Sequence, residues 1–182
     1  MLSADINNGW LTGVVHCCSP HFNVRPSGDA ISLLVVHNIS LPAGQFGGPY
    51  ITDLFMGCLE CNADPSFSDL EGLRVSAHCL IRRDGSVIQY VSFLDRAWHA
   101  GVSCFEGREG CNDFSIGIEL EGTDTDPYEQ VQYQQLAIVA KMLIKQYPSI
   151  TKERIVGHCD IAPGRKTDPG PSFDWQYFHA LM

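Results

Sequence analysis

Ile31-Ser-Leu-Leu-Val-Val36 is the stretch that decides the fold, because apolar side chains occupy all but one of its positions. A run of this kind, without alternation of polar and apolar residues, is typical of a strand covered on both faces. It leads directly into His37, which we expect at or near the carboxyl end of the strand. The rest of the chain must therefore supply further strands and two covering layers.

Three other segments have the pattern of strands. Residues 75–83 and 86–91 flank Asp84-Gly85, a dipeptide that is typical of tight hairpin turns. Residues 114–121 alternate, so that the apolar side chains share one face and Glu119 lies on the other. These segments and residues 31–36 predict one central sheet.

Three segments are predicted to be helices. Residues 50–56 have helical spacing and stop at Gly57. A long amphipathic helix is expected from about Asp126, as its N-cap, to Tyr147. A short last helix is expected over residues 173–181, with Ser172 as its cap. The predicted class is therefore α/β (α+β), a central mixed β-sheet with flanking helices.

Length and composition fit one globular domain. The chain has 182 residues, of which 45% are hydrophobic and 18% charged, enough for a sizeable core. Residues 1–30 are rich in turn-forming residues, and we expect an irregular N-terminal segment that wraps the domain. No repeat or linker divides the sequence, so residues 1–182 are predicted to form a single domain.

Charge and hydropathy narrow the function. The formal net charge of −9 argues against a nucleic-acid-binding protein, which needs a basic surface. The chain shows no apolar stretch long enough for membrane insertion, and residues 1–8 lack the pattern of a signal peptide. We therefore expect a cytoplasmic protein, with its eight cysteines as reduced thiols. Cys58-Leu-Glu-Cys61 has no second ligand pair at zinc-finger spacing, so no structural zinc is expected there.

The stretch from Val156 to Pro171 carries most of the candidate chemistry. It contains His158, Lys166 and Asp168 among several prolines and glycines, which predict a rigid loop without regular helix or strand. Together with His37, the histidine and the aspartate of this loop suit a catalytic zinc with an open fourth position. Spacing alone leaves other roles open: both histidines could bond loop carbonyls, and the aspartate could form an Asx turn.

Two more ionisable residues could act beside such a metal. Glu119 lies on a solvated sheet face in the simplest interpretation, but a buried Glu119 could serve as a general base on a rigid strand. Gly117 shares its face and would leave room for a ligand. Lys166 is solvated in the simplest interpretation, whereas in a stiff loop it could donate to a developing oxyanion.

Six blocks of sequence, in the same order along the chain, resemble the type 2 N-acetylmuramoyl-L-alanine amidases, which include peptidoglycan-recognition proteins and phage amidases. The resemblance extends from about Trp10 to the end of the chain. The blocks are His37-Asn-Ile-Ser40, Phe46-Gly-Gly-Pro49, Arg74-Val-Ser-Ala-His78, Ala97-Trp-His-Ala-Gly101, Cys111 to Gly122, and Gly157 to Trp175.

The resemblance implies a fold, a metal and a set of roles. It implies the amidase type 2 fold over residues 1–182, with Zn²⁺ as the cofactor. The zinc ligands implied are His37, His158 and Asp168. Glu119 is implied to activate the hydrolytic water, and Lys166 to stabilise the oxyanion.

The resemblance also implies the reaction and its substrate. In the cytoplasmic recycling branch of this family, the amide between the lactyl group of 1,6-anhydro-N-acetylmuramic acid and L-alanine of the stem peptide is hydrolysed. An anhydromuropeptide is thus the expected partner, with no obligate protein partner. Substrate contacts are implied for Asn38, Arg74, Trp98 and Arg108, the arginines being suited to peptide carboxylates.

Three alternatives remain open at this point. The chain could be a binding module of the peptidoglycan-recognition type without catalysis, although the complete set of candidate ligands favours an enzyme. It could be a zinc peptidase or deacetylase that acts on another amide. It could also be an amidase of the intact cell wall, against which the expected lack of a signal peptide argues.

Overall fold

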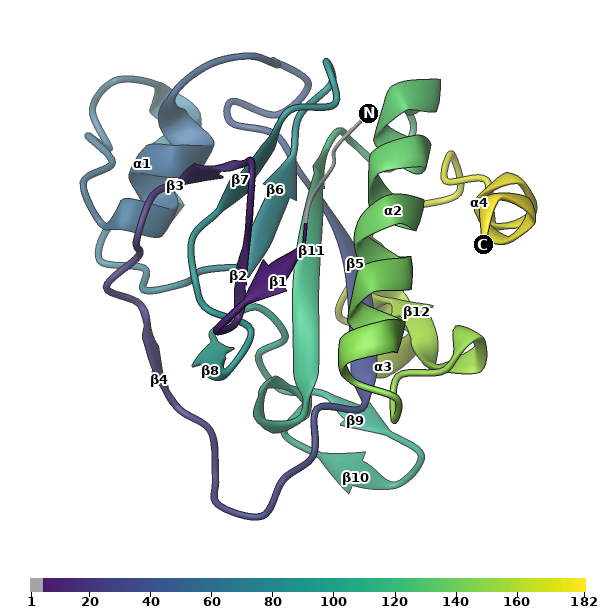
Figure 1. Cartoon of the computed structure of the whole chain (residues 1–182). Coiled ribbons are helices and arrows are strands. Elements are labelled where there is room, and N and C mark those ends of the chain that lie inside the picture. The colour runs from purple at the N-terminus through teal and green to yellow at the C-terminus, as the bar shows by residue number, and fades with distance from the viewer. Residues whose placement is uncertain (1–4) are drawn as a thin grey trace.

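A computed structural model describes residues 5–182 (Figure 1). The strands are β1 (Ile6–Asn7), β2 (Trp10–Leu11), β3 (Val15–His16), β4 (Phe22–Val24), β5 (Leu33–Ile39), β6 (Cys79–Ile81), β7 (Val87–Gln89), β8 (Asp95–Ala97), β9 (Cys104–Phe105), β10 (Arg108–Glu109), β11 (Ser115–Glu121) and β12 (Ile155–Gly157). The α-helices are α1 (Tyr50–Met56), α2 (Gln130–Gln146), α3 (His158–Ile161) and α4 (Trp175–Leu181), and the 3-10 helices are η1 (Pro65–Leu70), η2 (Cys111–Asp113) and η3 (Lys152–Arg154).

The main sheet has six strands in the order β12-β5-β11-β6-β7-β3. β5 pairs in parallel with both β11 and β12, and β11 also pairs in parallel with β6. β6 and β7 form the predicted antiparallel hairpin, and β3 is parallel to β7 at the edge. The predicted mixed sheet with flanking helices is therefore confirmed.

The two faces of this sheet pack against different elements. On one face, Leu34 and Val36 of β5 and the three apolar side chains of β11 join the buried side chains of α2 in one core. α4 extends the same core through Phe178. On the other face, α1 packs on Leu80 of β6. Figure 1 shows α1 and α2 on opposite sides of the sheet. Leu33 and Val35 of β5 pack on the face away from α2, against Phe114 and Ile161, so β5 is covered on both faces, as its apolar run predicts.

The helix starts differ from those predicted. α2 begins after Glu129, whose N–H donates to Oε1 of Gln132 at 3.0 Å. Asp126 instead accepts from the hydroxyl of Thr123 at 2.8 Å, in the turn before the helix. α4 is capped by Asp174 and not by Ser172, because the Asp174 carboxylate accepts from the N–H of Tyr177. The carboxylate of Asp126 is thus already used in the preceding turn, whereas at α4 a carboxylate two residues further along the chain takes the place of the Ser172 hydroxyl.

Two segments that were expected to be irregular contain regular structure. The N-terminal segment includes the short strands β1 to β4, and β3 joins the main sheet; residues 1–4 lie outside the described part. The loop around His158 begins with β12 and α3, which end before Pro163. Prolines and glycines thus confine the irregular part to the residues that follow α3. No helix in residues 5–182 combines the length and apolarity that crossing a membrane requires.

Candidate metal centre

The site is built on the sheet face that is opposite α2. Parallel pairing of β5 with β11 places Glu119 directly beside His37. Both side chains lie on the face away from the α2 core, because their neighbours Val36 and Ile118 point into that core. Rigid central strands therefore hold a histidine and a carboxylate next to each other. β5 runs through His37 to Ile39, so this histidine lies two residues before the carboxyl end of the strand, near that end as predicted.

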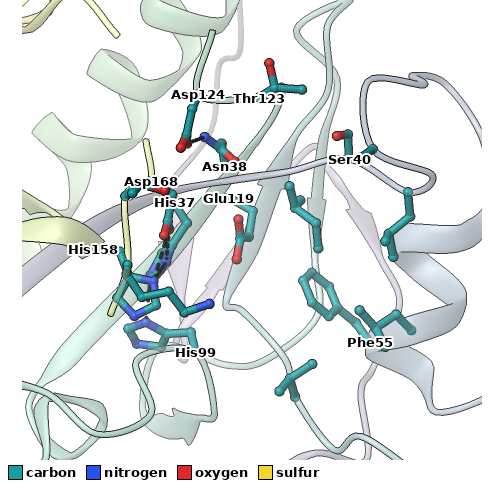
Figure 2. Close-up of a pocket in the computed structure, with 18 of the residues that line it drawn as sticks. His37, Asn38, Ser40, Phe55, His99, Glu119, Thr123, Asp124, His158 and Asp168 are labelled. Atoms are coloured by element: carbon teal, nitrogen blue, oxygen red, sulfur yellow. Dashed lines mark hydrogen bonds and ion pairs between the residues drawn. The ribbon is translucent and has the colours of Figure 1, made fainter. Parts of the chain in front are cut away.

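Three side chains converge above this floor. Nδ1 of His37, Nδ1 of His158 and Oδ2 of Asp168 are each 3.0 Å from the other two. The histidines are 1% and 3% exposed, and Figure 2 shows all three side chains pointing toward one another. In residues 5–182 this is the only group of three or more histidine, cysteine or acidic side chains with metal-ligand geometry.

The hydrogen-bond acceptors around the group favour a candidate cation site. Nε2 of His158 lies 3.1 Å from the carbonyl oxygen of Ala100, so this nitrogen must carry the proton. The other nitrogen, Nδ1, then directs a lone pair toward the carboxylate of Asp168. Lone pairs that face one another in a buried site are unfavourable unless a cation lies between them.

The size of the group fits a small transition metal. An equilateral triangle with sides of 3.0 Å has its corners 3.0/√3, or about 1.7 Å, from its centre. Zinc bonds to nitrogen and oxygen are about 2.0–2.2 Å long, so one ion can reach all three atoms from a point just outside their plane. Two imidazoles and one carboxylate with a fourth position open are a ligand set of catalytic zinc sites.

The surroundings of His37 and Asp168 set the charges of these two ligands in the direction that metal binding needs. Burial lowers the pKa of His37 to about 4, so this imidazole is neutral near pH 7. Burial would raise the pKa of Asp168, but the close contacts of its carboxylate with His158 and His37 outweigh that effect and hold the pKa below its ordinary value. Neutral imidazoles and an ionised carboxylate are the forms that bind metal ions.

Glu119 is buried without a full set of partners. It is 8% exposed, and its Oε2 is buried with no hydrogen-bond partner. Burial, and then the charge of Asp168, raise its pKa well above the ordinary value, while Lys166 acts in the opposite direction. A buried carboxyl oxygen without a partner is costly in a purely structural role, so the arrangement favours a group that receives its partner from a bound molecule.

A cleft of about 720 Å³ opens over the three ligands and Glu119. Leu54 and Phe55 of α1 line one side, and the segment from Arg165 to Asp168 lines another (Figure 2). The exposed Lys166 is part of this lining. Charged and polar groups are thus gathered at one end of the cleft, and apolar side chains at α1.

Two of the four predicted substrate contacts also line the cleft. The amide nitrogen of Asn38 donates to Oδ1 of Asp124 at 2.8 Å and to the carbonyl of Pro169 at 3.1 Å. The indole N–H of Trp98 donates to Oδ1 of Asn23 at 2.7 Å. These bonds hold both side chains in place at the wall.

The two arginines lie elsewhere. Arg74 lines a smaller hollow of about 150 Å³ that shares Leu54, Leu70 and Leu73 with the main cleft. Arg108 lines neither space. It forms an ion pair with Asp29 at 2.7 Å, and its guanidinium lies 4.0 Å from the ring centre of Phe114.

His99 is a residue of the site that sequence reasoning missed. Its Nδ1 lies 2.9 Å from Nε2 of His37, and its Nε2 lies 3.1 Å from the hydroxyl of Ser115. A Cβ on Gly117 would come within 2.4 Å of the His99 ring. The expectation that Gly117 leaves room for a ligand was therefore wrong, because the space holds His99. In the sequence, the one available signal of the position of His99 was Gly117, a glycine on the strand face that carries Glu119.

Fold and site together define a class of protein. The family model of N-acetylmuramoyl-L-alanine amidases matches residues 27–171, and the chain belongs to this family. It is 60% identical to the 1,6-anhydro-N-acetylmuramyl-L-alanine amidase AmpD of Escherichia coli (strain K12), over 97% of this chain and 96% of the relative. The AmpD of Citrobacter freundii is 61% identical, over 97% of this chain and 94% of the relative.

Solved structures agree with this assignment. A crystal structure of a selenomethionine derivative of AmpD superposes with a TM-score of 0.95 at 60% identity, covering 100% of this chain and 99% of that one. AmpDh3 from Pseudomonas aeruginosa, in complex with anhydromuramic pentapeptide, has a TM-score of 0.63 at 32% identity, covering 86% of this chain and 61% of that one. The architecture is thus the amidase type 2 fold.

Proposed function

We propose that this protein is a zinc-dependent amidase that hydrolyses the bond between the lactyl group of 1,6-anhydro-N-acetylmuramic acid and L-alanine of the stem peptide. The observation that carries the proposal is the convergence of His37, His158 and Asp168 beside the unpartnered carboxyl of Glu119. High identity to AmpD amidases over nearly the whole chain supports the substrate. The reaction would then belong to the recycling of cell-wall fragments, and we place it in the cytoplasm.

His37 and His158 would hold zinc through Nδ1, and Asp168 through a carboxylate oxygen. Zinc held by these ligands supplies a Lewis acid that makes water more acidic and polarises the scissile carbonyl. The fit of the ligand triangle and the neutral state of His37 support zinc over Mg²⁺, which prefers oxygen ligands in octahedral geometry.

The protein's own residues would move the protons. Glu119 takes a proton from the attacking water and later returns it to the nitrogen of the leaving L-alanine, so that the carboxylic acid and the amine are the products. Lys166 donates to the oxygen that becomes negative when the carbonyl is attacked. The exposed position of Lys166 on the cleft wall lets the ammonium reach that oxygen.

The walls of the cleft would position the substrate on both sides of this bond. Asn38 and Trp98 line the cleft and are proposed to contact the substrate directly. Arg74 would reach a carboxylate of the stem peptide from the adjoining hollow. Arg108 would have to leave Asp29 to do the same, so its contact requires the side chain to break this ion pair.

Digestion of an anhydromuropeptide beside its reduced, non-anhydro counterpart tests the proposal. Mass spectrometry should find the sugar separated from the intact peptide, and a chelator should abolish the reaction until zinc is restored. Cleavage within the peptide would instead indicate a peptidase. Turnover that survives complete metal removal would refute the zinc mechanism.

A further inference from the structure

A two-residue segment, His99-Ala100, contacts the outer ring nitrogens of both histidines of the candidate centre, and His99 also lines the cleft. The ring of His99 lies 2.9 Å from Nε2 of His37, and the carbonyl of Ala100 lies 3.1 Å from Nε2 of His158. Each contact is to the ring nitrogen that faces away from the other ligands. The backbone that follows β8 is therefore placed to control the protonation sites of both imidazoles.

The carbonyl of Ala100 determines the tautomer of His158. A carbonyl oxygen only accepts hydrogen bonds, so its 3.1 Å contact assigns the proton to Nε2 and leaves Nδ1 without one; Nη2 of Arg165 lies farther from Nε2, at 3.4 Å. Arg165 donates to the same carbonyl at 2.7 Å, which occupies its second acceptor position. His158 is thus held with its lone pair directed at the centre.

His99 determines the tautomer of His37 in a similar way. If Nδ1 of His37 binds a metal, Nε2 must carry the proton and donate to Nδ1 of His99. The second nitrogen of His99 then carries its own proton and donates to the hydroxyl of Ser115, 3.1 Å away. A His99 with its proton on Nδ1 would reverse this chain and block the metal-binding nitrogen of His37.

Two features keep the segment in place. Oδ1 of the buried Asn112 accepts from the N–H of His99 at 3.1 Å and from the N–H of Ala100 at 2.8 Å. Gly117 provides the space for the His99 ring, because a Cβ there would come within 2.4 Å of it. Backbone and side chain of His99 are therefore both restrained from outside the centre.

We propose that His99 and Ala100 are positioning elements that fix the tautomers of His37 and His158, and so prepare both Nδ1 atoms to bind the metal. This inference rests on the proposed zinc site. His99 does not need to touch the substrate in this role. Its loss should weaken metal binding, and a residue that keeps only the acceptor should restore it.

Metal affinity of matched variants provides the first test. Zinc is titrated into the metal-free full-length protein in competition with a chromophoric chelator. Loss of a partner behind a metal-binding histidine costs about 10–100-fold in affinity, and we expect this loss for His99→Leu. In His99→Asn the amide oxygen takes the place of Nδ1, so the loss should be less than about tenfold.

His21 offers a control pair on the same protein. It is a buried histidine whose Nδ1 lies 3.1 Å from a backbone carbonyl, that of Val75, and it is not part of the centre. His21→Leu and His21→Asn should bind zinc as tightly as the wild type. Equal weakening by His21→Leu and His99→Leu would show a general packing effect and overturn the inference.

Nitrogen-15 NMR of the histidine rings in the zinc-loaded wild type provides the second test, and it needs no substitution. We expect protons on Nε2 of His37 and His158, and none on Nδ1 of His99. A proton on Nδ1 of His99 overturns the inference even if His99→Leu fails to fold. A wild type that does not bind one zinc ion refutes the proposed centre, whereas normal binding by both wild type and His99→Leu refutes this inference alone.

Discussion

Glu119→Gln changes one atom of the proposed general base and leaves the shape of the side chain intact. The amide cannot accept a proton from water, so the proton transfers assigned to Glu119 cannot occur. Loss of a general acid–base group costs about 10²–10⁴-fold in rate. At about 1.36 kcal/mol for each factor of ten, the transition state loses about 2.7–5.4 kcal/mol.

The same substitution should stabilise the metal-free fold. Glu119 has a buried oxygen without a partner and a pKa well above its ordinary value because of burial. The folded state therefore holds a proton that the unfolded state has released above about pH 4.5. Stability falls by up to about 1.4 kcal/mol per pH unit between the unfolded and folded pKa values. Glu119→Gln removes this loss, so its gain should be near zero at pH 4.5 and about 1 kcal/mol or more at pH 7.5.

Glu121→Gln is the matched control, two residues further along the same face of β11. Oε1 of Glu121 accepts from the N–H of Gly47 at 2.6 Å, and Oε2 accepts from the N–H of Arg83 at 3.1 Å. An amide can accept only one of these bonds, and its NH₂ would face the other N–H. This variant should therefore lose about 1–3 kcal/mol, opposite in sign to Glu119→Gln.

The assay combines urea unfolding of the chelated proteins at pH 4.5 and 7.5 with turnover and metal content of the zinc-loaded proteins. Glu119→Gln should retain zinc, lose most turnover and gain stability only at the higher pH. Turnover within tenfold of the wild type would refute the role of Glu119. Equal stability changes at both pH values would refute the account of its buried carboxyl.

Three more predictions concern the ligand group, the packing around His99 and the buried histidine His78. Asp168→Ala should lose its metal, and a variant that retains one zinc per chain by metal analysis would remove Asp168 from the ligands. Gly117→Ala places a Cβ 2.4 Å from the His99 ring, about 1 Å closer than an ordinary 3.4 Å contact, so thermal unfolding should show a loss of about 1–3 kcal/mol; an unchanged midpoint would contradict this packing. Burial holds the pKa of His78 well below its ordinary value, so the unfolded state binds the extra proton below pH 6.5, and His78 alone should lower stability by about 1.4 kcal/mol between pH 7.5 and 5.5. Its ring should show no titration by NMR over that range, and a midpoint near 6.5 would refute the burial argument.

The sequence predicted the elements whose pattern reflects burial. The apolar run of β5 indicates a core on both faces, and the alternation of β11 indicates a core on one face. Both strands appear where expected, but β11 is buried on both faces. The start of α2 was placed three residues early, because Asp126 satisfies the cap pattern but uses its carboxylate for Thr123. A local sequence pattern cannot show whether a side chain such as Asp126 will cap the helix or form a hydrogen bond within the preceding turn.

The candidate site was predictable only in part for a similar reason. The members of the ligand group lie up to 131 residues apart, and spacing alone left each with a simpler role. The resemblance to amidases brought His37, His158 and Asp168 together, and the structure places them within bonding distance of one point. The role of His99 was not predicted, because it depends on a contact across the sheet face. Gly117 was the only sign of that contact in the sequence.

The parallel pairing of β5 has a consequence for how the protein is made. Leu33 pairs with Ser115, and Leu34 pairs with Ile155, so the two neighbours of β5 come 82 and 121 residues later in the chain (115 − 33 and 155 − 34). Parallel pairing over such separations is slow, because the chain between the strands must be ordered first. Until β12 arrives, β5 exposes an apolar edge that can pair with other chains. A nascent or truncated chain that lacks β12 is therefore incomplete in its site and also prone to aggregate.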